Sequence, residues 1–302
     1  MNDVKENECV QRLNHSFQFC RDLAYKSSSS FYAGMAQSPT DKRDAIFSIY
    51  AWLRLIDDIA DDEALSAEQR AAKLRKFSAY TQEILCNSCK NNSESKENFW
   101  LAFYHTVHHY QIPLEYFSEM IAGQEQDLIK HDYKTFAELY DYCHHVASTV
   151  GLMCIHIWGY DNDPKSRQMA EWCGIACQLT NILRDINSDR KSRHVYLPAE
   201  FVGKKELTSD QLADIPHDLL MQGISTLIKK TEYYYQNSLQ LYHAINPDSR
   251  LSFLYIMYKY KTLFEKIRHQ PEAIFKPIKI KLNMLEILKL YFVVNMTRLK
   301  SR

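Results

Sequence analysis

Glycine and proline are scarce in this chain. Its 302 residues include 7 glycines and 8 prolines, and long stretches contain neither. All-β proteins need many tight turns, which these two residues supply, so the composition argues against an all-β fold. It favours helices joined by short loops. Hydrophobic residues make up 46% of the chain, which is enough to build a sizeable core.

Three other features are missing. No apolar run reaches the length of about 18 residues that a transmembrane helix needs, so we expect none. The formal net charge is zero, which argues against a nucleic-acid partner. The polar start Met1–Glu6 predicts no signal peptide, and the eight cysteines then predict reduced thiols. We therefore expect a cytoplasmic protein.

The charge is unevenly distributed along the chain. From Lys259 to the end there are 11 Lys and Arg against 3 Glu, a net of +8, so the first 258 residues carry −8. A basic tail on a neutral protein suggests peripheral contact with an anionic surface, such as the inner face of a membrane. The apolar run 287–294 in this region either packs on the core, which we favour, or lies on a membrane.

The stretch Tyr50–Asp62 predicts a helix with a narrow acidic line. At about 100° per residue, Tyr50, Arg54, Asp57 and Asp61 share one face, while most of the remaining surface is apolar. A solvated helix carries its charges on a broad outer face. We therefore expect a buried helix whose polar line faces a cavity.

The same pattern returns in Gln178–Asp189, where Gln178, Asn181, Asp185 and Asp189 share one face. Carboxylates about 4 Å apart repel by about 4 kcal/mol per pair at an effective dielectric near 20, so four of them in one cavity need a cation. Oxygen ligands with few cysteines or histidines nearby point to Mg²⁺, which usually holds substrate phosphates. The alternative is two surface helices with incidental acids.

The apolar periodicity predicts the remaining helices. Four serines at 27–30 either cap a helix that begins at Phe31 or offer hydroxyl and N–H groups to an anion. The small residues Ala147, Ser148 and Gly151 allow another helix or a flat ligand to approach closely. A loop-rich connection is expected over 191–216. The predicted helices are 8–26, 40–62, 67–85, 99–109, 113–130, 136–158, 168–189, 217–245, 249–268 and 282–297.

These motifs resemble those of the squalene/phytoene synthase family. The resemblance covers residues 20–200, and it is weaker over 250–270, where Tyr260 is similar to a pocket tyrosine. The matching segments are Ser28–Tyr32 (a serine–aromatic motif), Tyr50–Asp61 (a first D-x-x-x-D), Tyr142–Gly151 (a central motif), Gln178–Asp189 (a second D-x-x-x-D) and Tyr196–Pro198.

The resemblance implies an all-α, single-domain helical bundle of the isoprenoid synthase type over residues 1–302, around a central cavity. It implies Mg²⁺-dependent head-to-head condensation of two prenyl diphosphates through a cyclopropylcarbinyl diphosphate. The residues Ser-Ser-Phe-Tyr and Val-Ala-Ser in these motifs are most similar to those of bacterial presqualene diphosphate synthases. They favour two farnesyl diphosphates as substrates, giving presqualene diphosphate, or squalene if NADPH is also used. The near alternative is a phytoene synthase that uses two geranylgeranyl diphosphates. An alternative of another class is a non-catalytic family member that acts as an assembly or binding protein.

The resemblance also assigns roles to residues. Asp57, Asp61, Asp185 and Asp189 would bind the magnesium ions, and with Arg54 and Tyr142 they form the expected catalytic set. Phe47 and Met35 are candidates for closing the end of the pocket and so limiting the length of the substrate chain. The expected substrate-binding set is Ser28, Ser30, Phe31, Tyr50, Val146, Val150, Gln178, Asn181 and Tyr260.

Four positions depart from the family pattern. Lysine often stands at the position of Ser29, and glutamate at that of Ser188, while His194 and Pro277 replace basic residues. Three of these changes weaken the positive charge expected near a diphosphate. The nearby residues able to compensate are Lys26, Arg193 and Lys276.

Overall fold

The computed structural model describes residues 2–27, 31–86, 99–276 and 278–300. Two isolated β-bridges are the only strand-like pairings in these ranges, so the predicted all-α fold is confirmed. The helices over the described ranges are α1 (Asn2–Lys26), α2 (Tyr32–Met35), α3 (Thr40–Ala60), α4 (Ala67–Cys86), α5 (Trp100–His109), α6 (Glu115–Asp127), α7 (Phe136–Cys143), α8 (Thr149–Trp158), α9 (Pro164–Lys191), α10 (Ser209–Asp214), α11 (His217–Ser238), α12 (Leu241–Ala244), α13 (Arg250–His269) and α14 (Met284–Lys300), with a π-helical turn η2 (His144–Ser148) and the 3₁₀ turns η3 (Ala199–Val202) and η4 (Pro271–Phe275).

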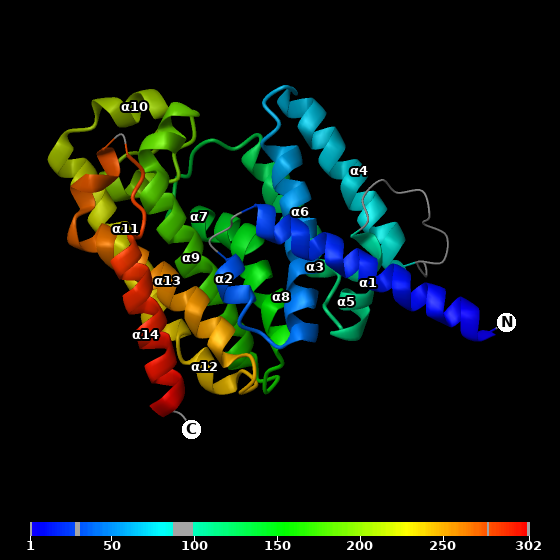
Figure 1. The fold of residues 1–302 in the computed structure, drawn as a ribbon. Helices are drawn as coiled ribbons and strands as arrows, with labels where there is room; N and C mark the ends of the chain where they lie inside the picture. Colours follow the sequence, from blue (N-terminus) through cyan, green and yellow to red (C-terminus); the bar gives the residue numbers. More distant parts are fainter. Residues whose placement is uncertain (1, 28–30, 87–98, 277, 301–302) are drawn as a thin grey trace.

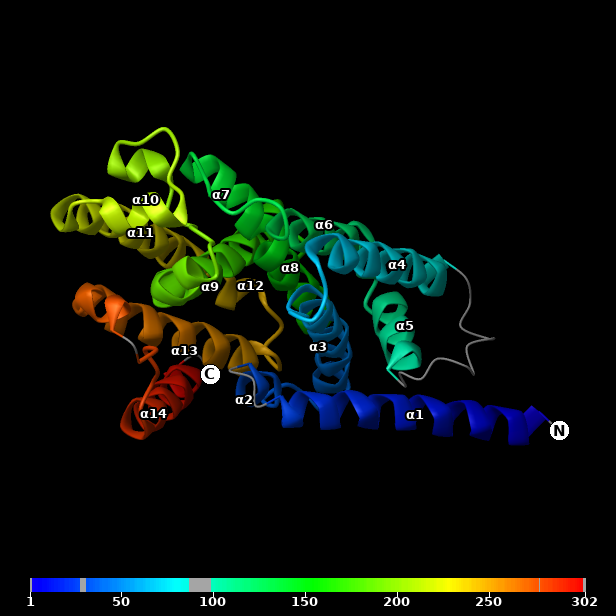
Figure 2. The same ribbon diagram turned by 90° about the horizontal axis from the view of Figure 1, so that it is seen from above.

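Helix α9 is the central element of the fold. The Asp163 carboxylate caps its start by accepting a hydrogen bond from the Lys165 amide at 2.8 Å. Pro164 occupies the first turn, where its missing N–H costs nothing. The helix packs against α7, η2, α8, α11 and α13, and Figures 1 and 2 show these elements gathered around it. One long helix thus presents both an apolar wall and the second acidic motif.

Helix α3 is buried on two sides, as its sequence predicts. Trp52 and Ile56 are fully buried, and the Trp52 indole Nε1 donates a hydrogen bond to Thr81 Oγ1 at 3.0 Å. The Trp52 ring stacks on Phe103 and meets the edge of Phe117. This packing fixes α3 against α4, α5 and α6, while Arg54, Asp57 and Asp61 on its acidic line keep solvent exposure.

The outer helices cover the two ends of the molecule. Helix α1 lies across α3 and α5, and its N-terminal turns extend beyond them (Figure 2). Helix α14 packs mainly on α13 and forms the outer edge at the other end (Figures 1 and 2). Among the described residues, no helix combines the length and apolar character needed to cross a membrane.

Two glycines allow the helices that carry the motifs to cross at backbone contact. A Cβ atom on Gly174 of α9 would lie 2.3 Å from the Ala147 carbonyl oxygen. A Cβ atom on Gly151 of α8 would lie 2.4 Å from the Ala170 carbonyl oxygen. The small residues at 147–151 therefore serve helix packing, which is one of the two functions that the sequence allows for them.

Helices α1 and α9 begin at Asn2 and Pro164, earlier than the predicted starts at 8 and 168, and three other segments differ more strongly from the prediction. The segment 136–158 is interrupted by the π-helical turn η2, and the segment 217–245 divides into α11 and α12. The connection 191–216 contains the short helix α10, which starts with a capping box between Thr208 and Gln211. The single-domain organisation stays a prediction.

Candidate active site

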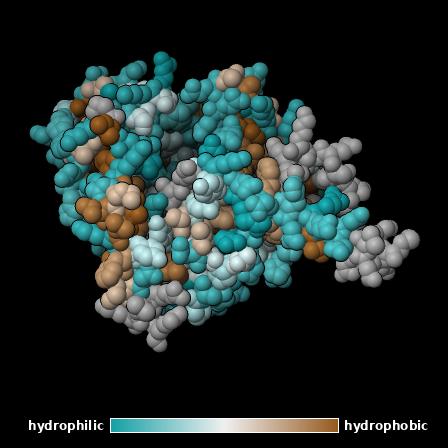
Figure 3. All heavy atoms as spheres, viewed as in Figure 1, coloured by the Kyte–Doolittle hydropathy of each residue, from teal (hydrophilic) through white to brown (hydrophobic). Residues whose placement is uncertain are grey.

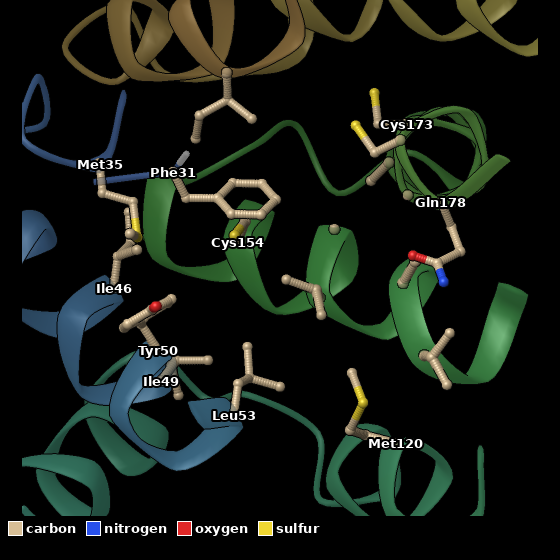
Figure 4. A pocket seen from close by; sticks show the side chains of 18 of the residues that line it. Phe31, Met35, Ile46, Ile49, Tyr50, Leu53, Met120, Cys154, Cys173 and Gln178 are labelled. Carbon is tan, nitrogen blue, oxygen red and sulfur yellow. The ribbon is translucent and has the colours of Figure 1, made fainter. Parts of the chain in front are cut away.

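A cavity of about 350 Å³ lies between α3, η2, α8, α9 and α13. Its walls are mostly apolar, and Figure 4 shows Phe31 and Gln178 pointing into it from opposite sides. Asp57 and Asn181 line it at one end, and Ile46 lines it about three turns of α3 away from Asp57. The cavity is therefore apolar along its length and carries its carboxylate and amide groups toward one end.

The first acidic motif stands at the polar end. Asp57 lines the cavity, and Gln124 Nε2 donates a hydrogen bond to its Oδ1 atom at 3.3 Å. Asp61 follows one turn later, at the C-terminal cap of α3. Arg54 forms an ion pair with Asp58 at 2.6 Å, and both side chains are largely exposed. Of these three predicted residues only Asp57 lines the cavity, whereas Asp61 does not and Arg54 is paired with Asp58.

The environment of this pair disfavours negative charge. Part of Asp57 is open to the cavity, but the surrounding protein still displaces most of the bulk water. This burial, with the nearby charge of Asp61, raises the pKa of Asp57 to about 7. Burial also raises the pKa of Asp61, although Arg54 and Arg70 act in the opposite direction. Two carboxylates with raised pKa values form a site that would gain from a bound cation.

The second acidic motif is already partly neutralised. Arg184 donates to the Asp185 carboxylate through Nε at 2.9 Å and through Nη2 at 2.5 Å, and Lys279 Nζ lies 2.9 Å from Asp185 Oδ1. Burial and the adjacent Asp185 charge raise the pKa of Asp189 to about 7, while Lys279 acts in the opposite direction. The Asp185 side chain is only 14% exposed, so these two cations hold it closely.

Gln178 and Asn181 precede this pair on α9 and line the cavity. Asn181 Nδ2 donates to Gln178 Oε1 at 3.4 Å, a long hydrogen bond. The Asn181 Oδ1 atom is buried and has no hydrogen-bond partner in the described structure. A buried amide oxygen without a partner is costly, so it is available to a cation or a donor from a ligand.

Magnesium fits this arrangement as a partner of the two pairs. Among the described residues, no three His, Cys, Asp or Glu side chains come together as a single metal site. Mg²⁺ commonly uses one or two carboxylates and completes its octahedral shell with water and substrate phosphate. Asp57 and the unpartnered Asn181 amide oxygen line the cavity, whereas Asp61, Asp185 and Asp189 do not line it and follow one or two turns later on the same two helices. These groups match that requirement when a phosphorylated substrate is also bound.

The predicted aromatic and aliphatic residues fall into two groups. Phe31, Tyr50, Val146 and Val150 line the cavity, and the Tyr50 hydroxyl donates to Ser27 Oγ at 2.8 Å. Tyr260 is buried and does not line the cavity, and its ring packs on Phe31 with centroids 5.2 Å apart.

Of the two residues predicted to close the end of the pocket, Met35 lines the cavity. Phe47 does not line it; this side chain is buried and stacks on Tyr32 with centroids 5.5 Å apart. Ser28, Ser29, Ser30 and Pro277 lie outside the described residues.

Tyr142 belongs to a polar network that the sequence analysis missed. It lines the cavity and hydrogen bonds with Tyr196, whose ring lies 5.3 Å away. The Tyr196 hydroxyl in turn contacts both Asp127 carboxylate oxygens, at 2.7 and 2.9 Å. Burial raises the pKa of Asp127, although the tyrosine hydrogen bonds act against this. The network leads from the cavity wall to a partly buried carboxyl group.

His194, one of the departures, joins this network at its outer side. Its Nε2 atom lies 3.1 Å from the Asp127 carbonyl oxygen and 3.1 Å from His131 Nδ1. Ser188, another departure, donates its hydroxyl to the Asp185 carbonyl oxygen at 2.8 Å. Neither residue supplies a fixed positive charge, whereas Lys279 does.

The sequence contained weak signals for some of the missed residues. Asp127 falls one turn after Gly123 and Gln124 on a helix with an apolar face, so it could have been assigned to the same side as Gln124. Lys279 gave no local signal, because it lies far along the chain from Asp185.

Added Mg²⁺ should raise the unfolding temperature more at about pH 8 than at about pH 5.5. Because the pKa values of Asp57 and Asp189 are raised to about 7, their protonated forms stabilise the metal-free fold. That contribution is complete below the unfolded pKa near 4 and is lost as the pH rises through 7. Mg²⁺ binds the deprotonated forms and offsets the loss.

Scanning calorimetry with and without MgCl₂ measures this effect. In the double variant Asp57→Asn, Asp189→Asn, both the pH slope of the metal-free protein and the Mg²⁺ effect should shrink. An equal Mg²⁺ effect at the two pH values would contradict the assignment.

Known proteins resemble this chain in sequence and in fold. A sequence model of the squalene/phytoene synthase family matches residues 24–286. The 15-cis-phytoene synthase of Synechococcus elongatus is 26% identical over 285 residues, covering 90% of each chain. That of Synechocystis sp. is 27% identical over 269 residues, covering 84% of this chain and 77% of the other. A crystal structure of a dehydrosqualene synthase with ligand, 24% identical, superposes with a TM-score of 0.81 over 97% of this chain and 100% of the other. At that identity the superposition supports the fold alone.

Proposed function

This chain belongs to the squalene/phytoene synthase family, and we propose that its cavity joins two prenyl diphosphates head to head. Such condensation is the reaction of the family. The observation that carries the proposal is the asymmetry of the cavity, which is apolar along α8 and α9 and acidic at the end where Asp57 stands. A prenyl diphosphate has the same asymmetry, since a hydrocarbon tail ends in a diphosphate.

The polar end would hold the diphosphate together with its metal. Magnesium bound by the Asp57–Asp61 and Asp185–Asp189 pairs supplies positive charge that offsets the charge developing on the leaving diphosphate. The amides of Gln178 and Asn181, which line the cavity, would donate hydrogen bonds to phosphate oxygens through their NH₂ groups and accept them from bound water through their oxygens. Arg184 and Lys279 would remain as fixed cations beside the second pair.

The rest of the cavity would protect the allylic cation left behind. Its apolar walls exclude water, which would otherwise trap the cation as an alcohol. Phe31 and Tyr142 line the cavity, so their rings would lie near the cation for cation–π attraction. Where a proton must leave the cation, we propose that the Tyr142 oxygen accepts it, the Tyr142 proton passes to Tyr196, and the Tyr196 proton passes to Asp127. The released diphosphate is the alternative acceptor.

Two substrate pairs have support from different observations. The curated relatives described above are phytoene synthases, which favours two geranylgeranyl diphosphates and a phytoene-type product. The motif residues at Ser28–Tyr32 and Val146–Ser148 favour two farnesyl diphosphates. Bulky Trp158 and Phe253, whose rings meet edge to face with centroids 6.0 Å apart, line the cavity and favour the shorter chain. The comparisons give NADPH no support, so it is not part of the proposal.

Incubation of the purified protein with each diphosphate and Mg²⁺, with and without NADPH, tests the function. Extracted products are identified by mass. We expect a head-to-head dimer of the geranylgeranyl or the farnesyl chain, and the preferred substrate decides between the two candidates. Failure to form either product while the protein still binds prenyl diphosphates would overturn catalysis and support the non-catalytic binding protein.

Replacing Lys279 with glutamine should strengthen Mg²⁺ binding in the absence of substrate by roughly two- to fivefold. Lys279 lies 2.9 Å from Asp185 and competes with the metal for that carboxylate. Isothermal titration calorimetry measures the change. Lys281→Gln is the matched control, because its exposed side chain lies in the same basic segment and should leave Mg²⁺ affinity unchanged. Equal or weaker Mg²⁺ binding in Lys279→Gln would show that the ion pair does not compete with the metal.

A further inference from the structure

Helix α14 presents a large apolar face to the solvent. Seven large apolar side chains are exposed along it, and Ile278 extends the patch just before the helix. Figure 3 shows apolar surface gathered along this edge of the molecule. Single exposed apolar residues are normal, but a contiguous group marks an interaction site. The exposed members on the helix are Met284, Leu285, Leu288, Tyr291, Phe292, Val293 and Met296.

The inner face of the same helix is apolar as well. Leu290 and Val294 are buried where α14 packs on α13. A helix on a protein surface normally has one polar face and one apolar face. Because α14 is apolar on both faces, packing on α13 uses only part of its apolar surface. The sequence favours packing of this segment on the core. The structure shows such packing for the inner face of α14, while its outer face stays exposed.

The charges around this face are almost all positive. Residues 276–296 contain four lysines, Lys276, Lys279, Lys281 and Lys289, and a single acid, Glu286. The Glu286 carboxylate is occupied, since it accepts hydrogen bonds from Lys266 at 3.0 Å and from the Asn283 amide at 2.6 Å. Lys279 pairs with Asp185 at 2.9 Å, so the patch combines exposed apolar side chains with Lys276, Lys281 and Lys289 as its remaining positive charges.

We propose that the outer face of α14 docks onto an anionic lipid bilayer, with the helix lying in the plane of the interface. Amphipathic interfacial segments bury apolar side chains by about 5–10 Å while their lysines contact anionic headgroups. A second copy of the chain fits this face less well. A two-fold interface brings a patch against itself, so the lysines of one copy would face those of the other.

Membrane docking suits the proposed function, on which this part of the inference rests. Prenyl diphosphates are amphiphiles that partition into membranes, and a head-to-head hydrocarbon product has no polar group to keep it in water. Docking would hold the protein at the surface where the substrate is concentrated and where the product can be released. The lipid binding itself can be tested without substrate, so its outcome is separate from that of the activity assay.

Vesicle flotation tests the inference. Two exposed residues of the face, Leu288 and Phe292 (60% and 66% exposed), are replaced by serine together. The matched control replaces Val10 and Ile129 (52% and 77% exposed), which lie elsewhere on the surface, also by serine. Each protein is mixed with phosphatidylcholine vesicles that contain or lack phosphatidylglycerol, and binding is repeated at high salt.

We expect wild type and control to bind the anionic vesicles, with weaker binding at high salt and to pure phosphatidylcholine. The Leu288→Ser, Phe292→Ser variant should lose roughly tenfold or more in affinity. Absence of wild-type binding, or equal binding by the variant, would overturn the inference. A wild-type dimer in sedimentation experiments that this variant converts to monomer, with no vesicle binding, would instead assign the face to self-association.

Discussion

Replacing Asp57 with asparagine should lower turnover of the prenyl diphosphate by about a thousandfold or more, while the protein stays folded. Asp57 is the carboxylate of the first motif that lines the cavity. Its environment raises its pKa, so removing its charge relieves repulsion and should not destabilise the fold. The loss should therefore fall on metal and diphosphate binding. Steady-state kinetics and thermal unfolding, measured on the same preparation, separate the two effects.

Asp58→Asn is the matched control for this experiment. Asp58 is the adjacent residue on the same helix, but its carboxylate pairs with Arg54 at 2.6 Å on a largely exposed surface. We expect its activity to stay within about tenfold of wild type, because exposed ion pairs contribute little. Asp185→Asn, in the second motif, should behave like Asp57→Asn in activity. Normal product formation by either Asp57→Asn or Asp185→Asn would contradict the proposed mechanism.

Replacing Gly174 with alanine should destabilise the protein by about 2–3 kcal/mol. The sign of this effect is informative, because Gly→Ala within a helix normally stabilises by about 0.5–1 kcal/mol. Here the new methyl group would lie 2.3 Å from the Ala147 carbonyl oxygen and 2.7 Å from the Ser148 Cα atom. Backbone atoms cannot move aside like the end of a flexible side chain, so α9 and η2 must separate.

Equilibrium denaturation in urea measures the change. Gly203→Ala serves as the comparison, because a Cβ atom there meets nothing within 4 Å and only the positive φ of 64° opposes it. Its cost should be about 1–2 kcal/mol, from the left-handed backbone alone. A stabilised Gly174→Ala protein would mean that the two helices are not in backbone contact.

Most of the fold could be predicted because its signals are local. The apolar spacing over 40–60 and the run of residues without glycine or proline gave helix α3 almost to its ends. The start of α10 was also readable in principle, since Thr208 and Gln211 form a capping box. The family motifs identified both acidic helices. What local signals cannot give is the way that distant helices meet.

The candidate site also combines residues that local sequence patterns predict with contacts that such patterns cannot predict. Asp57 and Asn181 were identified because each belongs to a helical line of polar residues on an otherwise apolar helix. The contact between Lys279 and Asp185 and that between Tyr196 and Asp127 join residues far apart in the sequence. No periodicity encodes such pairs. The family pattern led us to look for compensating charge at Lys26, Arg193 and Lys276, whereas the cations in contact with Asp185 are Arg184 and Lys279.

The π-helical turn η2 determines which side chains face the cavity. Tyr142, Val146, Val150, Cys154 and Trp158 follow one another at intervals of four, and all five line it. In a regular α-helix each such step drifts by about 40°, so the line would turn by about 160° between its two ends. A π turn takes one extra residue per turn, which restores roughly 100° of that drift. The extra residue therefore keeps these five side chains on one side of the helix, about 6 Å apart along it. An extended hydrocarbon can lie along such a row.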